Sequence, residues 1–262
     1  MMRIRGFLID INGVLYVGSQ VIPGAAQVVE YLQVQKIPHR FVTNNTTTPV
    51  WQLAQKLQSL GLAISESVIF STITATKGYL KMQGIQRIYP VLRREVQAEF
   101  AAEFEFDADK PQAVVIGDIG EAWDYQLMNQ LFHYVIQGAR IVALHKGKYW
   151  QTEEGLKIDI GAFVAGLEYV TGEEAVVIGK PSPEFFKMAL RSLNLEANEV
   201  AMVGDDIESD VGGAKQLGMY GILVRTGKYR EEIAYQSAVL PDMILDSIAA
   251  LPEVWEKYGV RS

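Results

Sequence analysis

The chain of 262 residues contains no cysteine and only three histidines, His39, His133 and His145, which lie far apart in the sequence. The missing cysteine excludes disulfide bonds and thiolate metal sites. Three scattered histidines also argue against a histidine-rich zinc site. A metal held by this chain should therefore have oxygen ligands.

Positive charge is also scarce, because 24 Lys and Arg face 31 Asp and Glu, for a net charge of −7 and a pI near 5.1. Proteins that bind nucleic acid usually show a basic surface instead. No apolar run approaches the length that spans a membrane, and the first residues lead straight into an apolar run without a signal peptide. We therefore expect a cytoplasmic protein that binds neither nucleic acid nor membrane.

Apolar runs alternate with segments of helical periodicity at the start of the chain, which is 49% hydrophobic overall. This order predicts a parallel sheet with right-handed crossovers. The expected strands cover 6–9 and 38–42, and the expected helices 25–35 and 51–60.

A second α/β unit, complete enough to bury its own core, follows from about residue 72. Its expected helices are 72–82, 96–104, 125–137 and 161–170, and its expected strands are 87–91, 113–117 and 140–144. The charged stretch 146–150 should form a turn or a short hairpin. The later strands 200–204, 221–224 and 243–245 and a last helix after 246 return to the first pattern.

The first candidate site residue is Asp10, which ends the apolar run 6–9. Ligands of open α/β sheets bind at the carboxyl ends of the strands, which is where Asp10 would lie. The following Asn12-Gly13 is also a strong hairpin signal. The two interpretations are compatible, and partners for Asp10 elsewhere in the chain decide between them.

Thr43 and Asn44 occupy the same relative place after the second expected strand. A hydroxyl, an amide and a helix N-terminus could together cradle an anion. The alternative is that these residues only cap the helix that follows, because Thr and Asn favour that position.

Lys180 stands between an expected strand, 174–178, and a helix opened by Pro183. Its neighbours Gly179 and Pro181 would hold it on a stiff strand-to-helix junction. A solvated surface lysine is the alternative, and the flanking Gly and Pro make it less persuasive.

The run 200–204 ends in two adjacent carboxylates, Asp205 and Asp206, and Glu208 and Asp210 follow closely. Four acidic groups in six positions repel one another unless a cation or a basic partner neutralises them. Oxygen ligands without His or Cys suit Mg²⁺, a hard cation. Asp210 could instead simply cap the helix that it enters.

Together these motifs form an ordered set at four expected strand ends, which a parallel sheet would bring to one edge. The set resembles the haloacid dehalogenase superfamily of aspartate-nucleophile phosphatases, and the inserted unit resembles the large cap of its NagD-like subclass IIA. Within that family, three stretches resemble the branch of phospholysine phosphohistidine inorganic pyrophosphate phosphatase. They are 8–16, 145–149, and 204–206 together with 210–214.

The resemblance implies an α/β fold with a Rossmann-like, doubly wound parallel core and a large inserted α/β cap. The core would comprise 1–72 and 176–262, and the cap 73–175. The implied function is a Mg²⁺-dependent phosphatase for a small phosphorylated molecule: a phosphomonoester, pyrophosphate or an N-phosphate. Relatives often dimerise through the cap, so a homodimer is also an expectation.

In this family's chemistry, Asp10 would attack phosphorus and form an aspartyl-phosphate that water then hydrolyses. The resemblance implies Mg²⁺ held by Asp10, Asp205 and the backbone carbonyl of Asn12, with Lys180 contacting Asp10 and a phosphoryl oxygen. Two further pairs complete the expectation: Thr43 and the Asn44 backbone hold phosphoryl oxygens, and Asp206 and Asp210 orient the metal's ligands and waters.

Asn12 departs from the superfamily pattern, which has an aspartate as general acid and base at this position. An amide cannot shuttle a proton at neutral pH. General acid–base catalysis is worth about 10²–10⁴-fold, so poor leaving groups should react slowly. Pyrophosphate, acyl phosphates and aryl phosphates should suffer least, and the resembling branch also carries a small polar residue here.

Three other functions can be compared with this one. A binding or regulatory protein for phosphorylated ligands would follow if Asn12 abolished useful turnover. A dinucleotide-dependent oxidoreductase is excluded because no Gly-x-Gly-x-x-Gly follows the first strand. A receiver-type signalling domain is disfavoured by the chain length and the insertion.

Five residues of the insertion could contact substrate: Arg93, Arg94, Asp118, Lys146 and Lys148.

Overall fold

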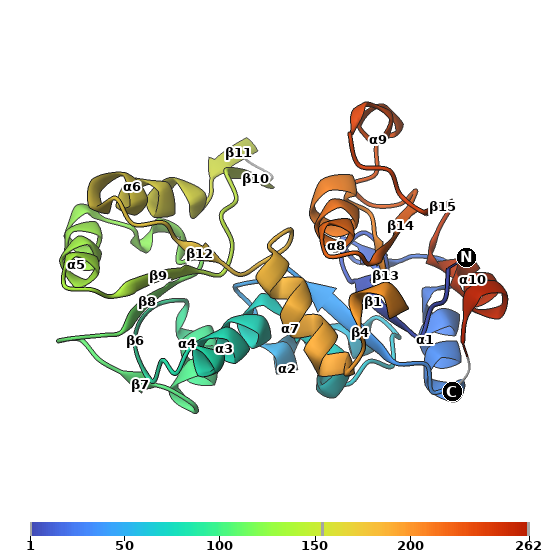
Figure 1. The fold of residues 1–262 in the computed structure, drawn as a ribbon, viewed down its shortest axis with the longest axis horizontal. Coiled ribbons are helices and arrows are strands. Elements are labelled where there is room, and N and C mark those ends of the chain that lie inside the picture. The colour runs from blue at the N-terminus through green and yellow to red at the C-terminus, as the bar shows by residue number, and fades with distance from the viewer. Residues whose placement is uncertain (1, 153–154, 261–262) are drawn as a thin grey trace. The chain divides into compact units, whose positions relative to one another are not determined.

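The structure is a computed structural model that describes residues 2–152 and 155–260 (Figure 1). Its internal contacts divide the chain into two units. One comprises Met1–Thr43, Val50–Phe70 and Lys180–Ser262, and the other Asn44–Pro49 and Ser71–Gly179. We call them the core unit and the inserted unit. The functional division into a core, 1–72 and 176–262, and a cap, 73–175, stays a prediction, and its outermost limits lie outside the described residues.

The core unit contains a six-stranded sheet in the order β15-β14-β13-β1-β4-β5. Strand β1 pairs in parallel with β13 on one side and β4 on the other, with Ile9 opposite Val203 and Asp10 opposite Val42. All five residues of β1 are buried. The strands are β1 Gly6–Asp10, β4 His39–Thr43, β5 Ile69–Ser71, β13 Val200–Gly204, β14 Tyr220–Val224 and β15 Met243–Leu245.

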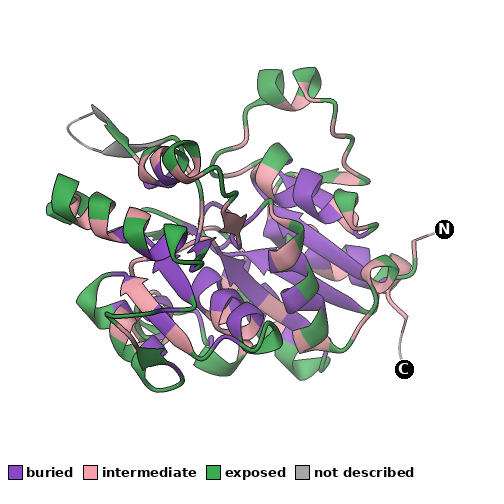
Figure 2. Cartoon of the chain, turned by 60° about the vertical axis from the view of Figure 1, so that its left-hand side comes forward, coloured by how far each residue is buried: buried purple, intermediate pink, exposed green. Residues whose placement is uncertain are grey.

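Helices cover both faces of this sheet because alternate residues of each strand point to opposite sides. Ile222 of β14 packs in one cluster with Val28 and Trp255, whereas its neighbour Leu223 packs with Val211. The predicted doubly wound fold is confirmed, and its strands are mostly purple in Figure 2. The helices of this unit are α1 Ala25–Val34, α2 Val50–Ser59, α7 Pro183–Leu193, α8 Gly213–Gln216, α9 Glu231–Gln236 and α10 Leu251–Tyr258.

Several shorter turns of helix complete the described chain. The 3₁₀ segments are η1 Glu66–Val68, η2 Gly120–Ala122, η3 Ala197–Glu199 and η5 Ile248–Ala250, and η4 Ile207–Gly212 is a π-helix. Of these, η4 matters most for the site, because π-helical turns often occur where function demands an irregular backbone.

A hairpin does follow β1, but its turn is not Asn12-Gly13. Strands β2 Tyr16–Val17 and β3 Gln20–Val21 pair around Gly18 and Ser19, and Gly18 has a φ of 60°. The interpretation of Asn12-Gly13 as the hairpin turn is therefore wrong. Both edges of β1 are already paired with β4 and β13, so the chain cannot fold back on it.

The inserted unit is built around a five-stranded sheet in the order β12-β9-β8-β6-β7, whose pairings are all parallel. A two-stranded antiparallel hairpin, β10 and β11, corresponds to the turn or hairpin expected at 146–150 and begins at Tyr149. The strands are β6 Arg87–Val91, β7 Glu105–Phe106, β8 Ala113–Ile116, β9 Arg140–Ala143, β10 Tyr149–Thr152, β11 Gly155–Ile158 and β12 Val176–Val177. The helices are α3 Thr72–Met82, α4 Arg94–Ala101, α5 Tyr125–Ile136 and α6 Gly161–Thr171.

The strand expected before Lys180 does not belong to the sheet of the core unit. That strand is the two-residue β12, which pairs with β9 of the inserted unit. Lys180 is therefore not at the end of a core strand. It opens the segment that enters the core unit ahead of α7, whose first turn is capped by Ser182 accepting a hydrogen bond from the Glu184 amide.

Among residues 2–152 and 155–260, no helix combines the length and the apolar character that crossing a membrane would require.

Strand β4 buries a histidine. The His39 side chain donates through Nδ1–H to the Ile37 carbonyl at 2.7 Å, whereas Nε2 is buried without a hydrogen-bond partner in the described chain. Burial lowers the pKa of His39 below its usual value, and nearby Arg40 lowers it further.

We expect His39 to make the fold acid-sensitive. The neutral imidazole is favoured in the folded chain, so below the unfolded pKa of 6.5 the unfolded chain binds the extra proton. The contribution of His39 to stability should fall as pH drops below 6.5, by at most about 1.4 kcal/mol per pH unit for one proton. Denaturant unfolding at pH 7.5 and 5.5 should show a smaller loss in His39→Gln than in wild type. The exposed His133→Gln is the matched control, and an equal loss in all three proteins would contradict the assignment.

Candidate active site

A buried lysine joins two carboxylates at the carboxyl end of β1. The Lys180 ammonium donates to Oδ1 of Asp10 at 2.5 Å and to Oδ1 of Asp210 at 2.6 Å. The side chains of Lys180, Asp10 and Asp210 are only 4%, 9% and 2% accessible. The alternative of a solvated surface lysine is therefore wrong. A charge network this dry persists only while its partners stay together, because an unpaired buried charge is very unfavourable.

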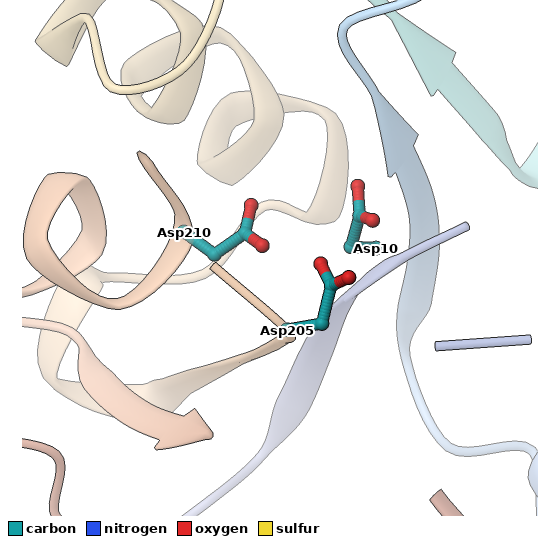
Figure 3. Close-up of side chains that lie close together, drawn as sticks. All are labelled: Asp10, Asp205 and Asp210. Atoms are coloured by element: carbon teal, nitrogen blue, oxygen red, sulfur yellow. The ribbon is translucent and has the colours of Figure 1, made fainter. Parts of the chain in front are cut away.

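A third carboxylate, Asp205, completes the cluster. Asp10, Asp205 and Asp210 are all buried, and one oxygen of each lies within 4.8 Å of the others. Figure 3 shows the three side chains lying close together. The cluster unites residues 10 and 205–210, which the sequence predicted to meet at one sheet edge.

Strand register and one glycine explain this meeting. Because Ile9 pairs with Val203, Asp10 and Asp205 leave neighbouring strands at the same edge. The π-helix η4 then returns Asp210 to the end of β13. A Cβ atom on Gly204 would lie 2.3 Å from the Asp210 side chain, so only glycine leaves room for this approach.

Asp206 caps η4, and Asp210 does not. Asp206 Oδ1 accepts hydrogen bonds from the Glu208 and Ser209 amides at 3.1 and 3.0 Å. Burial alone would raise the pKa of Asp206, but these amides and Lys228 hold it below its usual value. Asp210 instead accepts the Asp206 amide through Oδ2 and the Lys180 ammonium through Oδ1. The alternative of Asp210 as the helix cap is therefore wrong.

The cluster carries more negative charge than its single ammonium neutralises. Burial raises the pKa of Asp10 to about 7; Lys180 opposes this rise and Asp210 adds to it. Burial likewise raises the pKa of Asp205 to about 6, against the Lys228 amide, which stabilises the carboxylate. Burial acts to lower the pKa of Lys180, yet attraction to Asp10 and Asp210 leaves it above its usual value.

These properties fit a divalent cation. The donors are carboxylate oxygens, which hard cations prefer, and no nitrogen or sulfur ligand takes part in the cluster. Three carboxylates share the single ammonium of Lys180, so part of their negative charge lacks a counterion within the cluster. A cation bound beside Asp10 and Asp205 would supply it.

Family models match both ends of the chain. A haloacid dehalogenase-like hydrolase model matches residues 7–105, and a HAD-hydrolase-like model matches 177–251. Phospholysine phosphohistidine inorganic pyrophosphate phosphatase of mouse is 38% identical over 97% of this chain and 95% of its own length. The chain belongs to the haloacid dehalogenase-like hydrolases.

Solved structures agree with this family. A p-nitrophenyl phosphatase from Archaeoglobus fulgidus superposes with a TM-score of 0.88 at 28% identity, covering 96% of this chain and 99% of its own. NagD from E. coli K-12 superposes with a TM-score of 0.86 at 26% identity, covering 95% of this chain and 98% of its own. The predicted NagD-like family and the predicted enzyme class, a phosphatase, are confirmed. Hydrolases of this family generally use a divalent metal, which agrees with the buried carboxylates.

Thr43 and Asn44 do not lie at a helix N-terminus. Thr43 ends β4, one residue beyond the partner of Asp10, but α2 begins only at Val50. Residues 44–49 form a loop in which Asn45 Oδ1 accepts the Thr47 and Thr48 amides. The helix-cap interpretation is therefore wrong, as is the helix-terminus part of the anion cradle. Asn44 belongs to the inserted unit by its contacts, and phosphate binding by both residues stays a prediction.

Asn12 lies two residues beyond Asp10 and is exposed. Its backbone forms an isolated bridge with Tyr16 at the base of the hairpin. No hydrogen bond of its side chain occurs within the described stretches of the chain. Its predicted roles, in catalysis and as a carbonyl ligand, stay predictions.

The sequence did not point to one contact of the site, the Lys228 amide on Asp205. In the sequence, residues 226–228 only lie between the expected strands 221–224 and 243–245. The sequence signal that could have found this contact is the position of 226–228 directly after β14, which is the parallel neighbour of β13 in the core sheet.

Among the candidate residues of the insertion, Arg93 pairs with Asp118 at 3.0 Å and Lys146 pairs with Glu168.

Proposed function

We propose that this hydrolase is a Mg²⁺-dependent phosphatase of small phosphorylated molecules that works through an aspartyl-phosphate on Asp10. The observation that carries the proposal is the buried ammonium of Lys180 between Asp10 and Asp210, with Asp205 beside them. One lysine and three carboxylates give a cation and a nucleophile a common place at the sheet edge.

In the first step a carboxylate oxygen of Asp10 bonds to phosphorus while the bond from phosphorus to the leaving oxygen or nitrogen breaks. In the second step water attacks phosphorus, releases phosphate and regenerates Asp10. Lys180 orients the Asp10 carboxylate through its hydrogen bond to Oδ1 and offsets charge on the phosphoryl group. The residues that would bring the substrate's remaining phosphoryl oxygens into line are Thr43 and the Asn44 backbone.

Asp10, Asp205 and the Asn12 carbonyl would hold Mg²⁺, with Asp206 and Asp210 orienting the ligands and waters around it. When bound, the ion offsets the repulsion between an anionic nucleophile and an anionic phosphoryl group.

The proposed substrates have leaving groups that need little protonation. Asn12 cannot donate a proton at neutral pH, so alkyl phosphates should be the slowest class. A relative is named as a pyrophosphate and phosphohistidine phosphatase, and a neighbour is named as a p-nitrophenyl phosphatase. Pyrophosphate, N-phosphates and aryl phosphates are accordingly the proposed substrates. The cytoplasmic location and the homodimer through the cap stay predictions.

We expect phosphate release from pyrophosphate, phosphoimidazole and 4-nitrophenyl phosphate to require Mg²⁺ and to stop with EDTA. Sugar phosphates and nucleotides complete the panel, and Asp10→Asn should reduce release to the rate without enzyme, because the amide cannot act as the nucleophile. Equal release by wild type and Asp10→Asn on every substrate would refute the proposal. Saturable binding of these ligands by wild type without turnover would favour the rival, a binding or regulatory protein.

A further inference from the structure

A turn after β14 contacts both the acidic cluster and residues 11–15, which follow Asp10. We call residues 11–15 the nucleophile loop. The Lys228 amide donates to Oδ2 of Asp205 at 2.7 Å, and the Thr226 hydroxyl donates to the Gly13 carbonyl at 2.5 Å. The Tyr229 amide closes the turn by donating to the Thr226 carbonyl at 3.1 Å. We call residues 226–229 the Thr226 turn.

Two glycines allow this turn and the nucleophile loop to lie close to Asp205. A Cβ atom on Gly13 would lie 1.8 Å from Asp205 Oδ2, and one on Gly227 would lie 2.1 Å from the same oxygen. The Gly227 Cβ would also lie 2.4 Å from the Gly13 Cα. The carboxylate of Asp205 is thus enclosed between the nucleophile loop and the Thr226 turn.

The turn itself is held in one shape. Gly227 has a φ of 59°, a left-handed conformation that glycine adopts without strain. The Arg230 guanidinium donates to the Gly227 carbonyl at 3.2 Å and to the Tyr229 carbonyl at 2.7 Å. A loop pinned at this many points can fix the direction of a carboxylate that it touches.

We propose that the Thr226 turn is a positioning element that aims the Asp205 carboxylate at the cation and ties it to the loop that follows Asp10. The Lys228 amide acts on Asp205, and the Thr226 hydroxyl acts on the nucleophile loop through Gly13. This inference rests on the proposed function for the role of Asp205 as a cation ligand. A turn that only connects two strands would leave cation affinity unchanged when its hydrogen bonds are removed.

Lys228→Pro removes the amide hydrogen that Asp205 accepts. The φ of Lys228 is not in the left-handed region, which proline cannot adopt. Titration calorimetry of the full chain with MgCl₂ should show affinity lowered about 10- to 100-fold, as for other groups that orient metal ligands. Lys228→Ala keeps the amide and measures the contribution of the side chain, which should stay below about threefold because its ammonium lies 3.6 Å from Asp206 and is largely exposed.

Thr226→Val removes the other hydrogen bond, and Thr226→Ser retains it. With 4-nitrophenyl phosphate and saturating Mg²⁺, Thr226→Val should lower kcat about tenfold with little change in KM, since the bond orients the nucleophile loop rather than the substrate. Thr226→Ser should restore most of kcat. This pair decides the inference alone if Lys228→Pro does not fold.

Folded Lys228→Pro and Thr226→Val proteins with wild-type Mg²⁺ affinity and wild-type kcat would overturn the inference. Calorimetry needs no turnover, so the proposed function can fail separately. If the wild-type protein releases no phosphate, the proposed phosphatase activity is refuted. If Lys228→Pro nevertheless binds Mg²⁺ more weakly than the wild type, the positioning role is supported.

Discussion

Lys180→Met should lower phosphate release about 10³-fold. Methionine keeps the length and apolar stem of the side chain but removes the ammonium that Asp10 and Asp210 share. Losing one preorganised donor to a reacting oxyanion typically costs about 10²–10³ in kcat, and here the donor is also a full charge in a dry site. Initial rates with pyrophosphate and 4-nitrophenyl phosphate at saturating Mg²⁺ measure the loss.

The same substitution leaves two buried carboxylates without their cation. Breaking a buried ion pair by removing one partner costs about 3–5 kcal/mol, so unfolding must be separated from lost chemistry. The double variant Lys180→Met/Asp210→Asn removes the ammonium and one of its two carboxylates, and it should recover part of the stability in thermal melts without recovering activity. Lys180→Arg keeps the positive charge on a side chain of different shape. Its rate of phosphate release should lie between those of the wild type and Lys180→Met. A folded Lys180→Met protein with wild-type kcat would contradict the role of Lys180.

Asn12→Asp should raise turnover of alkyl phosphates by up to about 10²–10⁴-fold, the range that general acid–base catalysis contributes. Aspartate has nearly the shape of asparagine, and the exposed position allows the carboxylate without burying a charge. The gain should be small for 4-nitrophenyl phosphate, whose leaving group needs no proton. The measurement is kcat/KM across phosphate esters whose leaving groups differ in pKa.

Asn12→Ser is the control for this prediction, because a hydroxyl is polar but does not donate a proton readily at neutral pH. It should retain the wild-type dependence of kcat/KM on leaving-group pKa. Asn12→Asp should flatten that dependence. An equal change for all leaving groups, or no gain on alkyl phosphates, would contradict the assignment of Asn12 as a missing acid.

Strand ends were predictable because burial and sheet geometry have a direct signature in sequence. The run 6–9 is apolar throughout and becomes the fully buried β1, and the run 200–204 becomes β13 beside it. Once both strands are parallel neighbours, Asp10 and Asp205 must lie at one edge. The helices 25–35 and 72–82 were also close to α1 and α3, because their apolar spacing is regular.

Capping residues and turns were not predictable, because several polar residues in each loop suit the same place. Asp206 and Asp210 both precede or enter η4, and only the π-helical backbone turns Asp210 back to Lys180. Asn12-Gly13 has good turn chemistry, but the pairing of β1 on both edges moves the hairpin to Gly18. Tertiary pairing overrode local preference in both cases.

The sequence by itself determined which side chains this protein can offer: carboxylates that follow buried strands, no thiolate, only three imidazoles, and an amide at position 12. These are properties of side chains, which the sequence states outright. The tertiary structure alone decided how these groups are brought together and held. Lys180 follows a strand of the inserted unit yet reaches Asp10 in the core, and the backbone amide of Lys228 holds Asp205. The sheet that a two-residue strand joins and the direction of a backbone amide carry no side-chain signature, so only the folded chain shows them.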